Sequence, residues 1–176
     1  RAAASGAADG HLVVSRPTRR SGAAGADLPL ADRPGFLVRR LHQIHVALFA
    51  EECAPFGITP VQCSVLTALE RDAPLDQVSL AREVGIDRAN CTDVLRRLEE
   101  RKLIRRVASE TDSRAKLCDL TAAGRKLLAR LAPAAQRAHD RTLDALPRAE
   151  RDAFVRSLVR LVEVNNELGR AKLRLR

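Results

Sequence analysis

A helix-turn-helix pattern occupies residues 76–102, DQVSLAREVGIDRANCTDVLRRLEERK. Asp76 can cap a short helix that ends near Val84, and Gly85 suits the left-handed conformation that closes a helix. Asp87 can cap another helix only two residues later. Two short capped helices joined at a glycine turn are typical of a helix-turn-helix, so this stretch predicts a DNA-binding element.

The second helix of this pattern is expected to run from Arg88 to about Lys102 and to have one apolar and one basic side. The positions expected to face inward are Ala89, Val94, Leu95 and Leu98. Arg88, Asn90 and Thr92 project from its amino end, where Arg can read guanine and Asn can read adenine in a major groove. We therefore predict that these three side chains contact bases.

Two short apolar stretches follow, residues 103–108 and 115–120, and the polar segment 109–114 separates them. This spacing predicts a β-hairpin, the wing. Arg114 near its tip can enter a minor groove, whose negative potential attracts guanidinium groups, and Asp112 is placed to orient it. The residues expected to contact phosphates are Ser79, Arg82, Arg96, Arg105 and Lys116. The alternative interpretation of this set is a solvated basic surface.

Apolar residues at helical spacing predict further helices on both sides of this lobe. One is expected from Pro34 to about Cys53, and another begins at Thr59, where a hydroxyl cap precedes a proline. Its predicted buried stripe is Val61, Val65, Leu66 and Leu69. After the hairpin, Thr121 can cap a long helix, and a last helix follows Pro147. The last helix has more apolar surface than a monomer leaves in water, which predicts a homodimer.

The composition supports a nucleic-acid partner. Lys and Arg number 31 against 22 Asp and Glu, which gives a net charge of +9. An anionic membrane surface would also suit this charge, but no apolar run approaches the roughly 18 residues of a spanning helix. We expect a cytoplasmic protein. The sequence has no Gly-rich phosphate loop, zinc-ligand motif or nucleophile elbow, so we expect neither an enzyme nor a metal or cofactor.

Three regions are expected. Residues 1–32 are rich in Ala, Gly, Ser, Arg and Pro and are predicted to be a disordered tail. Residues 33–56 and 122–176 are predicted to form dimerisation helices, and residues 57–121 to form a winged helix-turn-helix lobe. The predicted fold class is mostly α (α+β).

Residues 112–124, DSRAKLCDLTAAG, resemble the signature of the multiple antibiotic resistance regulator (MarR) family, a D-x-R wing tip followed by V-x-L-T-x-x-G. The matching residues are Asp112, Arg114, Leu120, Thr121 and Gly124. The resemblance extends in order and spacing from about Pro34 to Leu168. It departs at Cys118, where the family usually has valine, and at Cys63, where an aromatic residue is usual. The resemblance implies a winged-helix repressor whose wing arginine enters the minor groove.

The resemblance also implies an effector bound between the first two helices and the DNA-binding lobe. In the family such effectors are often aromatic carboxylates or phenols, and residues 35–53, GFLVRRLHQIHVALFAEEC, resemble the branch that represses nicotinate and related aromatic-acid catabolism. We expect the effector to contact Arg39, His42, His45, Phe49 and Cys63. The two histidines have an alternative interpretation as packing or interface residues.

Three functions are compared. The first is a repressor of an approximately palindromic operator, released when an effector fixes two DNA-binding lobes at a spacing unsuited to successive grooves. The second is a thiol-oxidation sensor that uses Cys53, although the sequence has no tyrosine to hold a thiolate. The third is a non-specific architectural DNA binder, which leaves the capped recognition helix and the wing unexplained. We favour the first.

Overall fold

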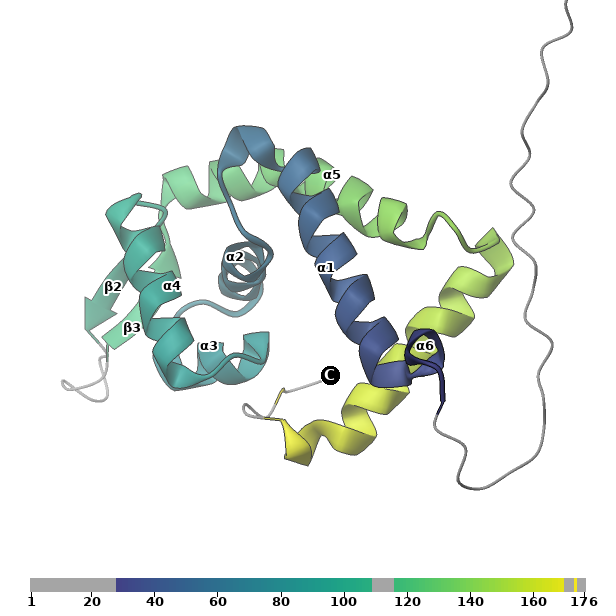
Figure 1. Cartoon of the computed structure of the whole chain (residues 1–176). Coiled ribbons are helices and arrows are strands. Elements are labelled where there is room, and N and C mark those ends of the chain that lie inside the picture. Colours follow the sequence, from purple (N-terminus) through teal and green to yellow (C-terminus); the bar gives the residue numbers. More distant parts are fainter. Residues whose placement is uncertain (1–27, 109–115, 170–172, 174–176) are drawn as a thin grey trace, which may run out of the picture.

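The computed structural model describes residues 28–108, 116–169 and 173 (Figure 1). The α-helices of this part are α1 (Pro34–Glu52), α2 (Pro60–Asp72), α3 (Gln77–Val84), α4 (Arg88–Glu100), α5 (Ala122–Leu143) and α6 (Arg148–Asn165). The strands are β1 (Leu75–Asp76), β2 (Ile104–Ala108) and β3 (Lys116–Leu120), and the 3-10 turns are η1 (Leu30–Asp32), η2 (Ala54–Phe56) and η3 (Asn166–Leu168). The fold is mostly helical with a small sheet, as predicted.

Side-chain caps fix the two helices of the helix-turn-helix. Asp76 accepts a hydrogen bond from the backbone N–H of Ser79 at 3.0 Å, and Asp87 accepts one from Asn90 at 2.9 Å. Gly85 ends α3 with φ of 71°. Each cap satisfies a backbone N–H group that the helix leaves without a partner, so the predicted starts of α3 and α4 are confirmed.

The predicted hairpin is β2 and β3, and a third strand joins its edge. The sheet order is β1-β3-β2 with antiparallel pairing, and Ile104 pairs with Leu120. β1 pairs with β3 through Leu75 and Cys118. The sequence did not predict β1, because two residues are too few to show strand alternation. Asp76 ends β1 and also caps α3, so the sheet leads without a loop into the first helix of the helix-turn-helix.

A single core lies where α2, α3, α4 and the sheet meet α5 and the carboxyl end of α1, which contributes Phe49. Its largest fully buried side chains include Val65, Leu66, Leu69, Leu80, Leu95, Leu98 and Leu131. Two of the predicted inward positions are wrong, because Val61 and Ala89 are exposed. With 100° per residue, Ala89 lies on the side of α4 opposite Cys91, Leu95 and Leu98, so its apolar character did not indicate its direction.

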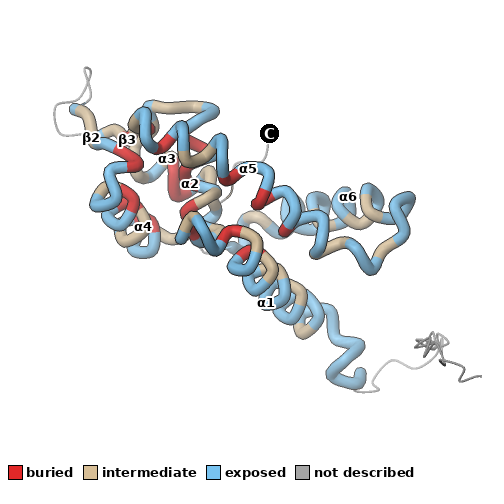
Figure 2. The backbone as a smooth tube through the Cα atoms, turned by 90° about the horizontal axis from the view of Figure 1, so that it is seen from above, coloured by how far each residue is buried: buried red, intermediate tan, exposed pale blue. Residues whose placement is uncertain are grey.

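α6 and the amino-terminal part of α1 extend away from this core. Figure 2 shows buried residues gathered in the lobe and along α5, whereas α6 has none. Exposed apolar residues on α1 and α6 include Leu37, Val38, Ile44, Val155, Val159, Leu161 and Val162. Exposed apolar surface of this extent is typical of an interface with another chain. In the described part of the chain, no helix is both long and apolar enough for a membrane span.

Candidate functional site

The structure places the predicted base-reading residues together at the amino end of α4. Arg88 is exposed there, and its guanidinium has no hydrogen-bond partner among the described residues. The Asn90 amide donates to the carboxylate of Asp87 at 2.6 Å. The Thr92 hydroxyl donates to the backbone carbonyl of Arg88 at 2.9 Å and accepts from Gln77 at 2.5 Å. Of the three, Arg88 is therefore the side chain best able to reach a base.

The predicted phosphate-contacting residues come from four elements of the lobe. They are Ser79 and Arg82 on α3, Arg96 on α4, Arg105 on β2 and Lys116 on β3. Ser79 donates to Asp76 at 2.7 Å, and Arg96 forms ion pairs with Asp93 and Glu100 at 2.6 Å each. Binding to phosphate would have to compete with these contacts. The predicted wing residues Asp112 and Arg114 lie outside the described residues.

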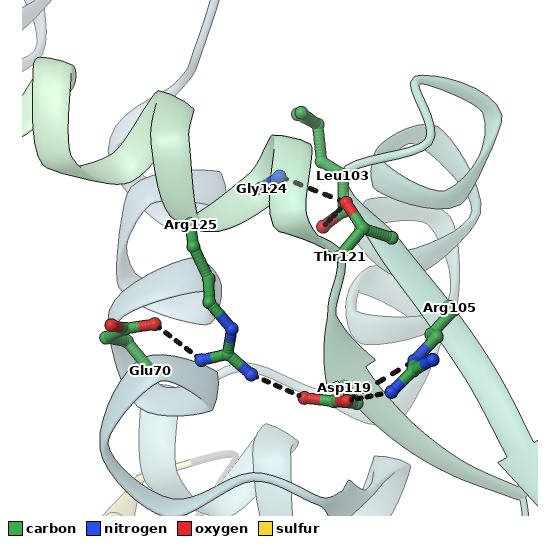
Figure 3. A network of polar contacts seen from close by, with 7 residues as sticks. All are labelled: Glu70, Leu103, Arg105, Asp119, Thr121, Gly124 and Arg125. Atoms are coloured by element: carbon green, nitrogen blue, oxygen red, sulfur yellow. Dashed lines mark hydrogen bonds and ion pairs between the residues drawn. The ribbon is translucent and has the colours of Figure 1, made fainter.

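A polar network joins the wing to α2 and α5 (Figure 3). One carboxylate oxygen of Asp119 accepts from Arg105 at 2.8 Å, and the other accepts from Arg125 at 3.1 Å. Arg125 also donates to Glu70 on α2 at 2.9 Å. The sequence did not predict this network, because its ion pairs depend on how α2, β2, β3 and α5 pack together. It connects a predicted phosphate-contacting residue, Arg105, to the body of the lobe.

Asp119 gives a pH-dependent prediction. The hydrogen bonds from Arg105, followed by the nearby positive charges, lower the pKa of Asp119 below its ordinary value. Its contribution to stability is therefore fully present above the unfolded-state pKa of about 3.9 and is lost as the pH falls through the folded-state pKa. Asp119→Asn should lower the free energy of unfolding by up to about 1 kcal/mol at pH 7. In urea titrations from pH 7 to pH 3, this difference should shrink below about pH 4; a constant difference would contradict the account.

A cavity of about 340 Å³ lies between α1, α2, α3 and α5. Its lining includes His45 and Phe49 from α1, Cys63 and Arg71 from α2, Glu83 from α3 and His139 from α5. The cavity therefore brings together three of the predicted effector residues, His45, Phe49 and Cys63. It also touches α1, α5 and the first helix of the helix-turn-helix, which is the expected location.

The other two predicted effector residues lie elsewhere. His42 lines a neighbouring cavity of about 640 Å³, which shares His45 and His139 with the first cavity. Phe154 and Leu158 of α6 also line it. Among the described residues, those that line these two cavities do not include Arg39. Its guanidinium instead lies 5.3 Å from the ring centroid of Phe36. The structure therefore does not bring Arg39 to His45, although the sequence spacing suggested one face.

Two histidines form one wall of the smaller cavity. The rings of His45 and His139 stack with centroids 5.0 Å apart and an interplanar angle of 16°, and Nδ1 of His45 lies 2.9 Å from the Thr142 hydroxyl. Burial lowers the pKa of His45, and the nearby charges of His139 and His42 lower it further. The neutral imidazole is therefore favoured, and it offers a flat ring together with a hydrogen-bonding nitrogen.

Arg71, Glu83 and His139 line this cavity without having been predicted from the sequence, and Arg71 bears most on the ligand. It lies near the end of α2, where it donates to the carboxylate of Asp72 at 2.7 Å and forms an ion pair with Glu83 of α3. Nothing in the helical periodicity distinguishes it from the other arginines of the chain. Its position gives the cavity a guanidinium, the group best shaped to hold a carboxylate.

The cysteines do not have the environment of a reactive thiol. Burial raises the pKa of Cys53 and of Cys63, and it raises that of Cys91 to about 11. All four cysteines are free thiols. Oxidation sensors require a lowered thiol pKa, so these directions are opposite to those needed for a thiolate sensor.

The helix-turn-helix, the hairpin beside it and the long helices on both sides define a winged helix-turn-helix protein. The sequence pattern of the MarR family matches residues 56–115. Among curated relatives, the HTH-type transcriptional repressor NicR of Pseudomonas putida is 26% identical over 158 residues, which cover 89% of this chain and 100% of NicR.

Two solved structures combine high fold similarity with higher identity. BpsR of Bordetella bronchiseptica, in a structure described as showing how 6-hydroxynicotinic acid regulates its DNA binding, is 32% identical with a TM-score of 0.74, over 77% of this chain and 97% of BpsR. CouR of Rhodococcus jostii, bound to a 23-mer DNA duplex, is 33% identical with a TM-score of 0.71, over 78% of this chain and 99% of CouR. The chain belongs to the MarR family of transcriptional regulators.

Proposed function

We propose that the chain is a homodimeric, sequence-specific repressor that leaves its operator when a small aromatic carboxylate, such as a hydroxynicotinate, binds. The cavity between α1, α2, α3 and α5 is the observation that supports this function best. A ligand there contacts α1, α5 and the first helix of the helix-turn-helix together. It can therefore favour one arrangement of the DNA-binding lobe over another, which is the requirement for an effector.

The chemistry of the cavity suits an aromatic acid. Its volume of about 340 Å³ is within the range of small-molecule sites. Phe49 and the stacked imidazoles offer flat surfaces to a ring, and neutral His45 can bond to a ring hydroxyl or nitrogen. Arg71 offers its guanidinium to the carboxylate. The DNA binding of the relative BpsR is regulated by 6-hydroxynicotinic acid, which supports the same class of ligand here.

In the proposed dimer, the DNA-binding surfaces of both copies contact the operator. The exposed apolar residues of α1 and α6 would be buried between two copies, and the two α4 helices would enter successive major grooves of an approximate palindrome. Arg88, with Asn90 and Thr92 beside it, would read bases, and the basic residues around α4 would hold phosphates. Arg114, oriented by Asp112, would enter the minor groove.

The test is binding to the promoter region beside the gene for this protein, measured against unrelated DNA of equal length and across a range of salt concentrations. We expect the promoter complex to be at least roughly 1,000-fold tighter than the complex with unrelated DNA at physiological salt. Equal affinity for both DNAs, with a steep dependence on salt, would contradict the proposal and favour the architectural binder.

A further inference from the structure

An ion pair joins α2 and α3 at the wall of the proposed effector cavity. Arg71 donates to Asp72 through Nε and to Glu83 through Nη2, and both Arg71 and Glu83 line the cavity. The side chain of Glu83 is only 9% exposed, whereas that of Arg71 is 51% exposed. A carboxylate of the protein itself is thus held at the cavity wall by the guanidinium that an effector carboxylate would use.

We propose that Glu83 is a built-in competitor for the effector: it occupies Arg71 in the empty protein, and the carboxylate of the effector takes its place. The inference rests on the proposed function and specifies how the cavity controls the DNA-binding lobe. The exchange breaks the ion pair between α2 and α3 and forms one between α2 and the ligand. No covalent bond changes.

Arg71 exchanges one carboxylate partner for another, whereas the contact between α2 and α3 is lost. A guanidinium has five N–H donors, so Nε can keep its bond to Asp72 while Nη2 changes its carboxylate partner. The ligand adds burial of its ring against Phe49 and the histidines, which favours the exchange. Glu83 gives up its ion pair with Arg71, and this pair is a contact that holds α3 against α2 at the cavity. Its loss allows α3 to shift relative to α2.

A movement of α3 reaches the recognition helix directly. Gln77, the first residue of α3, donates to the hydroxyl of Thr92 on α4, and its backbone carbonyl accepts from the Cys91 thiol at 3.6 Å. These contacts join α3 to α4 near the end that carries Arg88. Breaking the Arg71–Glu83 pair therefore disturbs the surface proposed to read bases, so effector binding and operator binding oppose each other.

The test compares 6-hydroxynicotinate with its uncharged amide, 6-hydroxynicotinamide, by isothermal titration of the full chain. The variant Glu83→Gln removes the competing charge, so we expect it to bind the acid roughly 10-fold more tightly than the unaltered protein. Its affinity for the amide should not change. Its operator complex should already be at least roughly 5-fold weaker before acid is added, because the contact between α2 and α3 is lost.

A second test variant, Arg71→Gln, keeps the proposal testable if Glu83→Gln does not fold, and a third variant serves as the control. Arg71→Gln should bind the acid roughly 10-fold more weakly and should lose the preference for acid over amide. Glu51→Gln is the matched control, because it removes a glutamate that pairs with Arg141 outside the cavity lining; its acid affinity should equal that of the unaltered protein.

The outcomes separate this inference from the proposed function. If the unaltered protein binds the acid and releases DNA, but Glu83→Gln or Arg71→Gln binds the acid with unchanged affinity, the competitor role of Glu83 is overturned and the repressor function stands. If the unaltered protein binds DNA specifically and no aromatic acid binds to it, both the effector part of the proposed function and this inference are overturned.

Discussion

The variant Arg88→Ala is expected to bind the operator roughly 30-fold or more weakly than the unaltered protein. Arg88 is exposed at the first position of α4, whereas the side chains of Asn90 and Thr92 are held by their neighbours. A guanidinium that reads guanine contributes about 1–3 kcal/mol of discrimination, and the proposed dimer loses two such contacts. The measurement is a titration of fluorescently labelled promoter DNA at fixed salt, followed by anisotropy.

A charge-matched control distinguishes base reading from the general electrostatic attraction between the basic protein and DNA. Arg148 is the first residue of α6, which lies on the opposite side of the molecule from α4 (Figure 1), so Arg148→Ala removes the same charge away from the proposed surface. Its operator affinity should change little. If Arg88→Ala weakens binding to operator and to unrelated DNA by the same factor, Arg88 is a phosphate contact and the assignment to a base is wrong.

Gly124→Ala is expected to lower the free energy of unfolding by about 3 kcal/mol or more. Gly124 lies in the first turn of α5 and donates to the hydroxyl of Thr121 at 3.0 Å (Figure 3). The backbone N–H of Thr121 donates to the carbonyl of Leu103 at 3.1 Å. A Cβ at this glycine would lie 2.1 Å from that carbonyl oxygen and 3.2 Å from the side chain of Leu120. The backbone oxygen cannot move aside without breaking the hydrogen bond from Thr121, which holds the start of α5 against the segment between α4 and β2.

Thermal unfolding followed by circular dichroism measures this effect, with an expected fall in Tm of roughly 6–12 °C. Gly35→Ala is the matched control, because a Cβ at Gly35 in α1 meets nothing within 4 Å. Alanine is the better helix former, so this control should be neutral or slightly more stable. A Gly124→Ala protein as stable as the control would show that the close approach at Leu103 is not a constraint on the fold.

The elements of the fold could be predicted from the sequence because their signals are local. Asp76, Asp87 and Thr121 each cap a helix with a bond to a residue two or three positions away. Thr59 and Gln62 form a reciprocal capping box in the same way. Local hydrogen bonds of this kind depend on neighbouring residues alone, so helix starts were located well.

The candidate site was predicted only in part, because its decisive contacts join distant segments. Arg71 meets Glu83 across a turn and a strand, and no short motif marks either residue. The link from Glu70 through Arg125 to Asp119 likewise depends on how α2, α5 and β3 pack. His45 and Phe49 could be predicted together because they are four residues apart and share one face of the first helix. Arg39 was grouped with them by spacing, but its guanidinium lies over Phe36 instead.

The most direct test of effector control is the titration of the promoter complex with 6-hydroxynicotinate and other aromatic acids. The account predicts that one aromatic acid dissociates the specific complex, that its uncharged amide does not, and that Arg71→Gln blunts the response. A specific promoter complex that no aromatic acid affects, but that oxidation of the thiols dissociates, would contradict the account.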